Sequence, residues 1–233
     1  MNFDLFELNG RSPKRSKRNV LRSPDFKGAG ILLAMVVVGG LAGCGATRPM
    51  QYYQLTVPPD VHHAETNASG ISLALGPLVA SHLYREDRIV FSSGPQQMGT
   101  YEFQRWTEPP AEMIQEVLLR QLRASNRYRE VFTQRSASRS DYVLRGRLYD
   151  FKEVNGSPLQ ARVTVEFELK DMKSGSTVWS HYYNHDEPVS GKDVSAMVAA
   201  LDRNVQRGVG EVKASLEQYF SSLPPDNNSA TDR

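Results

Sequence analysis

A single cysteine is the most reactive side chain in this sequence. Cys44 is the only cysteine among 233 residues, and Leu41, Ala42 and Gly43 precede it directly. The small side chains of Ala42 and Gly43 suit the narrow subsites of a signal peptidase, and the thiol of Cys44 is a nucleophile that accepts a diacylglycerol through a thioether. This tetrad is typical of a bacterial lipobox. The sequence therefore predicts cleavage before Cys44 and attachment of lipid to it.

Residues 1–43 have the other two parts of a secretory signal. They carry seven basic and three acidic residues, and the apolar run at residues 29–42 is 14 residues long. A helix needs about 20 apolar residues to cross the core of a bilayer, so the run predicts a cleaved signal. An uncleaved anchor with an incidental cysteine is the alternative. An N-acyl chain and an S-diacylglycerol on Cys44 would hold the mature chain stably, since each buried CH₂ contributes roughly 0.8 kcal/mol.

A second group of residues offers metal chemistry. His181 and His185 lie four residues apart in a segment of strand character, so both imidazoles point to the same face, and Asp186 and Glu187 follow them. Imidazoles with nearby carboxylates are ligands for a divalent metal. This cluster motivates the alternative function, a metal-binding or hydrolytic envelope lipoprotein. The other interpretation is that these side chains lie on the solvent-facing side of a hairpin and bind nothing.

Sequence motifs for catalysis are absent. The sequence contains no G-x-S-x-G, G-x-x-x-x-G-K-[ST], H-E-x-x-H or C-x-x-C pattern. Because its one cysteine is assigned to lipid, the chain lacks thiolates for a structural zinc site and partners for a disulfide. An enzyme would have to rest on scattered groups, and packing alone must hold the fold.

The charge of the predicted mature chain argues against nucleic-acid binding. Residues 44–233 hold 21 basic and 23 acidic residues, a net charge of about −2, whereas the full sequence has a net charge of +2. Binding to nucleic acid needs a basic face on the folded domain, and the sequence does not indicate one. The 190 residues after the cleavage site suit one domain with a proper core.

Alternation of apolar and polar residues predicts a sheet. Strands are predicted at residues 51–57, 71–79, 88–91, 100–106, 128–132, 141–154, 160–170 and 177–183. In residues 160–170 every odd position from 161 is apolar and every even position is polar, which is typical of a strand with one buried face. Lys173, Ser174 and Gly175 supply a turn, so residues 160–183 are expected to form a hairpin.

The same period predicts which side chains face the core. Val79 is expected on the apolar face of its strand with Leu73 and Leu75, and Gly76-Pro77 is expected to bend this strand or end its regular part.

In the strand after residue 141, Leu144 and Leu148 are expected on one face and Phe151 on the opposite face. Trp106 and Trp179 are expected in the core rather than at an interface.

Two amphipathic helices complete the prediction. Residues 108–124 repeat apolar positions at steps of four behind Pro110, which a first helical turn tolerates because its missing N–H has no partner to lose. Ser190 is a candidate N-cap, with Asp193 three residues later. Apolar positions then mark about seven turns of a long helix that Pro224 ends.

These elements predict an α+β fold with a single domain, in which two amphipathic helices, including a long C-terminal helix, pack on a mixed, mostly antiparallel sheet. The predicted boundaries are a lipoprotein signal peptide at 1–43, a tether at 44–50, the α+β domain at 51–221 and a disordered tail at 222–233.

The chain also resembles a known family. Residues 52–220 are similar to the ABC-type transport auxiliary lipoprotein family, in particular to its PqiC-like, MCE-associated members. The segments that carry the resemblance are Tyr52-Tyr53-Gln54-Leu55, Leu75-Gly76-Pro77, Leu83 to Arg85 with Ile89-Val90, and Arg105-Trp106 with Glu108-Pro109. The chain departs from the family at Ser81-His82, where the family commonly has a proline.

The resemblance implies a function without catalysis, metal or cofactor. It implies a lipoprotein that works with an MCE-domain protein and an inner-membrane permease, moves lipids between inner and outer membranes and supports envelope integrity. Gly45 follows the lipidated residue where retention in the inner membrane commonly requires aspartate, so the periplasmic face of the outer membrane is expected. A homo-oligomeric ring would suit this role, because cyclic symmetry is common among oligomers.

Overall fold

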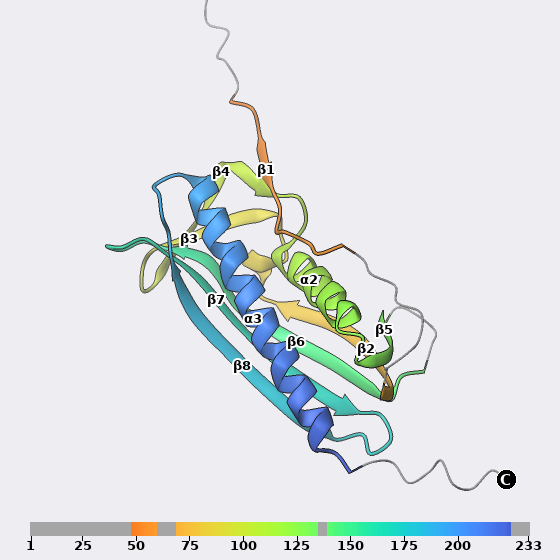
Figure 1. Ribbon diagram of the computed structural model, residues 1–233. Coiled ribbons are helices and arrows are strands. Elements are labelled where there is room, and N and C mark those ends of the chain that lie inside the picture. Colours follow the sequence, from red (N-terminus) through yellow and green to blue (C-terminus); the bar gives the residue numbers. More distant parts are fainter. Residues whose placement is uncertain (1–47, 60–68, 135–138, 225–233) are drawn as a thin grey trace, which may run out of the picture. The chain divides into compact units, whose positions relative to one another are not determined.

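The computed structural model describes residues 48–59, 69–134 and 139–224 (Figure 1). The predicted signal peptide, Cys44 and residues 225–233 of the tail predicted at 222–233 lie outside the described residues, and residue 222 belongs to the last helix. The elements in chain order are β1 (Gln51–Tyr53), β2 (Ser69–Ala80), the 3₁₀ helix η1 (His82–Tyr84), β3 (Arg88–Gly94), β4 (Gln97–Trp106), α2 (Pro110–Ala124), β5 (Tyr128–Thr133), β6 (Tyr142–Val154), β7 (Gln160–Asp171), β8 (Thr177–Pro188) and α3 (Val194–Ser222).

The strands of the described residues form one mixed sheet of eight strands that branches at β6. One edge of β6 pairs in parallel with β2 over residues 142–148 and with β3 over residues 152–154. The other edge pairs with β7 in antiparallel fashion, and β7 pairs with β8 in the same way. Beyond β3 lie β4 and then β1, and beyond β2 lies β5. The α+β fold and the mixed sheet are thereby confirmed, and the predicted hairpin is β7–β8.

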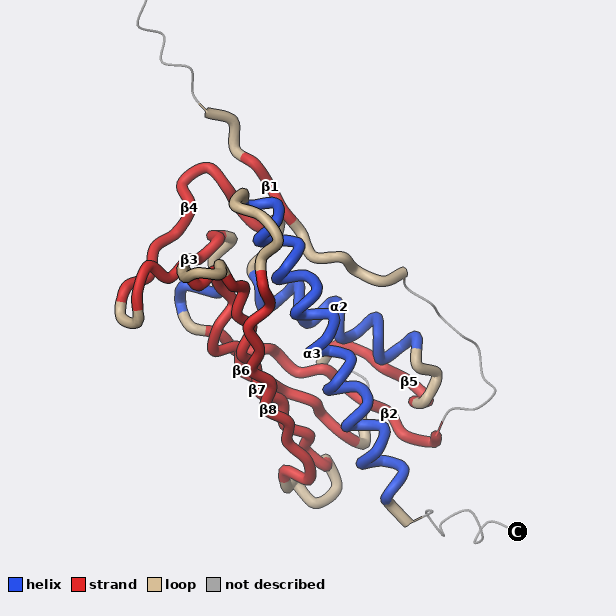
Figure 2. The backbone as a smooth tube through the Cα atoms, turned by 60° about the vertical axis from the view of Figure 1, so that its left-hand side comes forward, coloured by secondary structure: helices blue, strands red, loops and turns tan. Residues whose placement is uncertain are grey.

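Both helices cover the same face of this sheet (Figures 1 and 2). Helix α2 packs on β2 and β5, α3 packs on β7 and β8, and the two helices contact each other. The core lies between the layers, and its fully buried side chains include Trp106, Ile114, Leu118, Leu122, Leu144, Phe151, Leu169, Leu201 and Leu216. The predicted burial of Trp106 is confirmed, whereas Trp179 is only partly buried against the core. On the opposite face of β6, β7 and β8, the described part of the chain contains no helix.

The helix ends follow from their sequences, with one correction. Pro110 begins α2, as the missing N–H of a proline at the first position allows. The prediction of Ser190 as N-cap of the last helix is wrong, because Asp193 takes this position and its Oδ1 accepts from the N–H of Ala196 at 2.7 Å. None of the described helices combines the length and apolar content needed to span a membrane.

Irregularities in two strands overturn two of the predicted faces. Strand β2 continues through Gly76 and Pro77, but its register with β6 shifts between Leu75 and Leu78. Leu78 is therefore buried, and Val79 is exposed instead of sharing the apolar face.

A second shift separates Leu148 from Asp150 in the pairing of β6 with β7. Tyr149 is exposed at this point, and Phe151 is buried in the core with Leu148 rather than on the opposite face. Each extra residue reverses the parity of the strand that follows it.

Candidate functional site

The predicted lipid attachment site, Cys44, lies outside the described residues, and the chain that follows it joins the fold through an N-terminal arm, residues 48–57. Strand β1 within this arm pairs in parallel with β4, from Gln51 beside Gln104 to Tyr53 beside Trp106. Leu55 is buried in the core. The arm is thus bound both to the sheet and to the layer between sheet and helices.

Helix α3 clasps the arm just after Leu55. The N–H of Thr56 donates to Asp202 Oδ1 at 2.9 Å, and Gln206 Nε2 donates to the carbonyl of Thr56 at 2.8 Å. Gln206 also accepts from Gln121 of α2 at 2.8 Å, so the clasp connects the arm with both helices. A pull on the arm from the predicted lipid would be transmitted to this clasp and to the β1–β4 pairing.

The second polar region is the β8–α3 seam, formed by β8 residues 179–187 and α3 residues 203–215. Alternate β8 residues advance about 6.7 Å, and helix residues four apart advance about 6 Å, so the two rows stay in step. Arg203 Nε lies 3.2 Å from Glu187 Oε1, and Arg207 Nη2 lies 3.1 Å from Glu187 Oε2. At the other end of the seam, Trp179 Nε1 donates to Ser215 Oγ at 3.1 Å.

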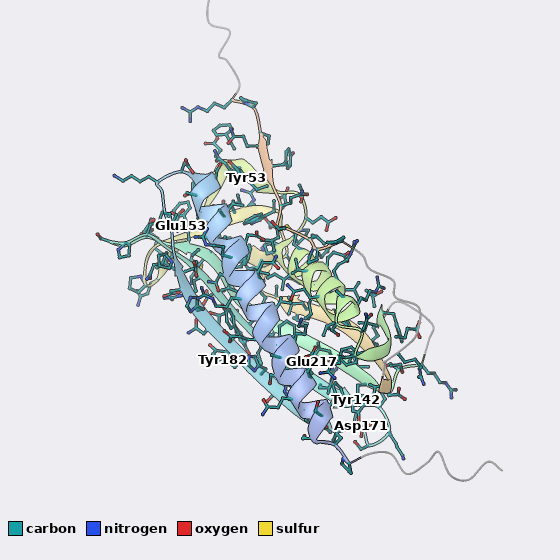
Figure 3. All side chains as sticks on the ribbon, viewed as in Figure 1. Tyr53, Tyr142, Glu153, Asp171, Tyr182 and Glu217 are labelled. Carbon is teal, nitrogen blue, oxygen red and sulfur yellow. The ribbon has the colours of Figure 1, made fainter. Side chains whose placement is uncertain are left out.

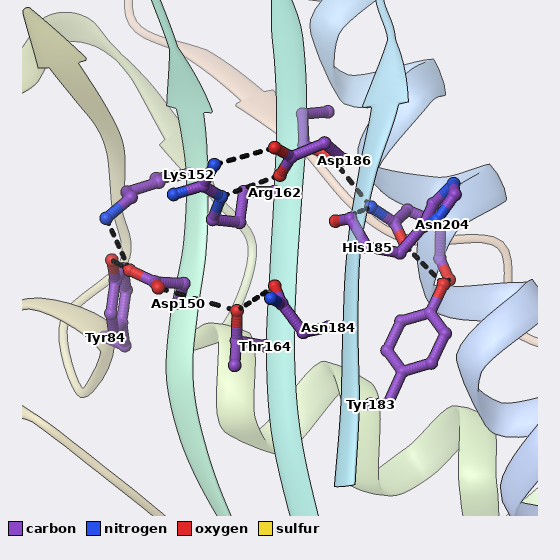
Figure 4. A network of polar contacts seen from close by, with 11 residues as sticks. Tyr84, Asp150, Lys152, Arg162, Thr164, Tyr183, Asn184, His185, Asp186 and Asn204 are labelled. Atoms are coloured by element: carbon purple, nitrogen blue, oxygen red, sulfur yellow. Dashed lines mark hydrogen bonds and ion pairs between the residues drawn. The ribbon is translucent and has the colours of Figure 1, made fainter.

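A buried tyrosine–asparagine pair lies in the middle of the seam (Figure 4). The hydroxyl of Tyr183 donates to Asn204 Oδ1 at 2.6 Å, and Asn204 Nδ2 donates to the carbonyls of Ala161 and His185 at 2.8 and 2.9 Å. Burial, with Glu211 as the next cause, raises the pKa of Tyr183 to about 12, so this hydroxyl stays protonated and donates. Asn204 therefore joins both strands of the β7–β8 hairpin to α3.

Both candidate metal ligands contact the helix layer and are only partly exposed to solvent. His181 and His185 lie on the face of β8 that contacts α3, so their predicted position on a wet face is wrong. His185 opposes Val163 in the ladder, and residues directly opposite each other share a face.

Arg207 and the carboxylate of Glu187 occupy the surroundings of His185. His185 Nε2 contacts Arg207 Nη1, and it lies 3.5 Å from Glu187 Oε2. Within the described residues, no group of three or more His, Cys, Asp and Glu side chains is arranged to hold a metal ion.

His181 is packed in the same row without a ligand-like arrangement. Its ring stacks on Trp179 with centroids 5.9 Å apart and planes 6° apart. Its Nε2 is buried and has no hydrogen-bond partner among the residues that the structure describes. Tyr183 stands between the two histidines on this face, so the imidazoles do not converge on one point.

The open face of β6, β7 and β8 carries a polar network (Figure 4). Thr164 Oγ1 donates to Asn184 Oδ1 at 2.9 Å, and Lys152 Nζ lies 2.5 Å from Asp150 Oδ1.

A two-bonded ion pair extends this network, because Arg162 Nε and Nη2 each donate to Asp186 at 2.6 Å. The hydrogen bond to Arg162 is the main reason why the pKa of Asp186 is lowered from its usual value. The polar side chains on this face thus bind one another across three strands.

Two tyrosines project from this open face. Tyr149 and Tyr182 are 44% and 60% exposed, and their ring centroids lie 6.3 Å apart. The hydroxyl of Tyr149 donates to Glu166 at 2.7 Å. Large aromatic side chains with this exposure are suited to contact a partner protein.

The Tyr183–Asn204 pair and the clasp at Thr56 were not anticipated from the sequence. The alternation of side chains in β8 indicated where Tyr183 lies. If Trp179 faces the core, then His181, Tyr183 and His185 face it as well. The partners on α3 had no such signal, because which turn of a helix lies over a given strand depends on the packing.

The comparisons with known proteins agree with this arrangement. The family model described as "ABC-type transport auxiliary lipoprotein component" matches residues 53–212. Among curated proteins, none matches the chain.

Two crystal structures have the same fold. Protein XCC0632 from Xanthomonas campestris has a TM-score of 0.65 at 19% identity, covering 73% of this chain and 97% of its own. An uncharacterized protein has a TM-score of 0.58 at 13% identity, covering 72% of this chain and 99% of its own. At these identities the likeness shows the fold alone.

Proposed function

The chain belongs to the family of ABC-type transport auxiliary lipoproteins, and from this we propose that it is a lipid-anchored, non-catalytic subunit of an MCE-type lipid transport system. In this proposal, lipid on Cys44 holds the domain at the periplasmic face of the outer membrane. The domain docks an MCE-domain protein, which connects with a permease of the inner membrane, and the assembly supports envelope integrity.

The observation that carries the proposal is the family match over most of the domain, together with the arrangement of its polar groups. In the β8–α3 seam, partners within the fold bind the polar groups of Tyr183, Glu187 and Asn204. The charged side chains of the open face pair with one another. Such groups stabilise a scaffold, and their arrangement supports a role in holding and docking rather than in turnover.

We assign docking of the MCE-domain protein to the open face of β6, β7 and β8. Tyr149 and Tyr182 supply exposed aromatic area there, and the Arg162–Asp186 ion pair lies on the same face. Copies of the chain arranged in a ring would present several such faces to one oligomeric partner.

The metal-binding alternative at His181 and His185 has less support. A metal at His185 would have to displace Arg207, and His181 lies on the far side of Tyr183. Nothing in the geometry of the seam favours that function over a structural one.

The test combines localisation, partner capture and envelope resistance. Wild-type protein and Cys44→Ala are expressed at equal levels, crosslinked in cells, purified and identified by mass spectrometry. We expect wild type to fractionate with the outer membrane and to capture an MCE-domain protein or its permease. We expect Cys44→Ala to leave the membrane fraction and to sensitise cells to detergent. Recovery of unrelated envelope proteins only, with normal detergent resistance of Cys44→Ala cells, would contradict the proposal.

A further inference from the structure

Strand β1 carries a tyrosine on each of its faces, with Gln51 beside Tyr53. Tyr53 packs partly buried against the core, whereas Tyr52 on the opposite face is 62% exposed. Met50, which directly precedes the strand, is 45% exposed. A strand with one wet face normally alternates apolar and polar residues. Tyr52 is the most exposed of the large hydrophobic side chains in the described part of the chain. The face of β1 that carries Tyr52 is thus more apolar than an ordinary solvent-facing strand face.

The composition of the N-terminal arm fits a lipid surface. Residues 48–57 contain one basic residue, Arg48, and no acidic residue. Tyrosine is enriched at membrane–water interfaces, because its ring is apolar and its hydroxyl remains hydrated. A cation beside it is attracted to anionic headgroups. Met50, Tyr52 and Arg48 therefore form a set with interfacial chemistry.

The predicted lipid lies close to this set along the chain. Cys44 is four residues before Arg48 and eight before Tyr52. An extended chain spans at most about 3.6 Å per residue, so Arg48 lies within about 14 Å of Cys44 and Tyr52 within about 29 Å. The headgroup layer is itself about 5–8 Å thick on each side of the hydrocarbon core. The tether thus keeps the arm near any membrane that holds the acyl chains.

The clasp fixes the direction in which the arm faces. Leu55 is buried, and Thr56 is bound to Asp202 and Gln206 of α3, so β1 cannot turn its outer side toward the core. Figure 3 places Tyr53 toward one end of the fold and Asp171 toward the opposite end. A membrane in contact with β1 would therefore meet one end of the domain.

We propose that Met50 and Tyr52 insert into the interfacial layer of the membrane that holds the acyl chains of Cys44, with Arg48 at the headgroups. This inference rests on the proposed function, since it requires lipid on Cys44. The arm then orients the domain with its opposite end away from the bilayer. The acyl chains hold the protein at the membrane, and the arm sets its direction.

Site-specific labelling tests the insertion. In the lipidated chain the sulfur of Cys44 is a thioether, so Tyr52→Cys introduces the only free thiol for an environment-sensitive fluorophore. Tyr182→Cys is the matched control, because Tyr182 is 60% exposed on β8. The lipidated proteins are placed in vesicles of phosphatidylethanolamine and phosphatidylglycerol with and without a nitroxide-labelled lipid. We expect blue-shifted, nitroxide-quenched emission at position 52 and neither change at position 182.

A label-free measurement guards against insertion driven by the fluorophore. Hydrogen exchange is measured for two unlabelled samples. One is the lipidated protein in vesicles, and the other is the chain without its lipid in detergent-free solution. We expect slower exchange in residues 48–53 on vesicles and unchanged exchange in residues 177–183. Equal quenching at both positions, or no slowing at residues 48–53, would overturn the proposal.

Intact mass separates this inference from the function on which it rests. If the mass of protein from membranes lacks the diacylglycerol, the proposed lipid anchor itself fails. If the lipid is present and position 52 is not quenched, only the insertion of the arm fails.

Discussion

The N-terminal arm and the β8–α3 seam are attached to the rest of the fold by different kinds of contact. The seam has a buried tyrosine–asparagine pair and several ion pairs, and it joins β7, β8 and α3. The arm has a three-residue strand, one buried leucine and two hydrogen bonds to α3, and its exposed side chains include the large apolar ones of Met50 and Tyr52. The seam therefore maintains the scaffold, whereas the arm is the part that we propose connects this scaffold with a membrane.

The largest expected effect is in the middle of the seam. Replacing Asn204 with alanine leaves the carbonyls of Ala161 and His185 without their side-chain donor in a buried site. We expect the free energy of unfolding to fall by roughly 3 kcal/mol. Asn184→Ala is the control, because its side chain is exposed and bonds only Thr164 among the described residues, and we expect a change below about 0.5 kcal/mol. Urea denaturation measures both, and equal losses would remove the distinction between seam and surface.

Two glycines of α3 test how tightly the seam is packed. A Cβ added at Gly208 would lie 2.8 Å from the ring of Tyr183, whereas a Cβ at Gly210 would meet no atom within 4 Å. We expect Gly208→Ala to destabilise the fold by about 1–3 kcal/mol through overpacking. Gly210→Ala is expected to stabilise it by up to about 1 kcal/mol, since alanine favours the helix. Thermal denaturation measures the change in stability of both variants. Stabilisation by both would contradict the tight packing of Tyr183 on α3.

The arm is expected to respond locally and more weakly. Asp202→Ala removes the acceptor for the N–H of Thr56, and we expect a loss of about 1 kcal/mol. Hydrogen exchange is expected to accelerate at the Thr56 amide and to stay unchanged in β7. Asp202→Asn keeps an acceptor oxygen and is expected to restore most of the protection. Acceleration throughout the domain would mean that the arm belongs to the scaffold.

The smallest effect concerns pH and the ion pair on the open face. Arg162 lowers the pKa of Asp186 in the folded state. The stability from this pair is therefore fully present above the unfolded pKa of about 3.9, and it is lost as the pH falls through the lower folded value. We expect Asp186→Asn to be less stable than wild type at pH 6, and we expect this difference to shrink as the pH falls below about 3.9. A difference that persists unchanged in acid would show that the lost stability comes from packing.

Sequence reasoning succeeded where one strand face is uniformly apolar. All five apolar residues of β7, from Ala161 to Leu169, are buried as expected. The period of the last helix likewise predicted its length and buried stripe, because both follow from local residue types. The α+β architecture could be inferred from these elements alone.

The errors arose where one inserted residue changes parity or register. The shifts in β2 and β6 buried Leu78 and Phe151 and exposed Val79, and the alternation of residues gives no sign of them. The histidines were assigned to the wet face because they are polar, although Trp179 shares their parity.

Contacts between side chains of different helices and strands could not be predicted from the sequence. Asn204 meets Tyr183 only because α3 lies over β8 at one particular position, which packing of the whole core decides. The clasp of Asp202 on Thr56 joins residues 146 positions apart for the same reason.

Photo-crosslinking in cells tests the central claim, that the open face docks a transport partner while the arm faces the membrane. A photoreactive amino acid is placed at position 182 of one protein and at position 52 of another, both with Cys44 intact. We expect position 182 to capture an MCE-domain protein and position 52 not to capture it. Capture of that protein from position 52 alone, or from neither position, would contradict the account.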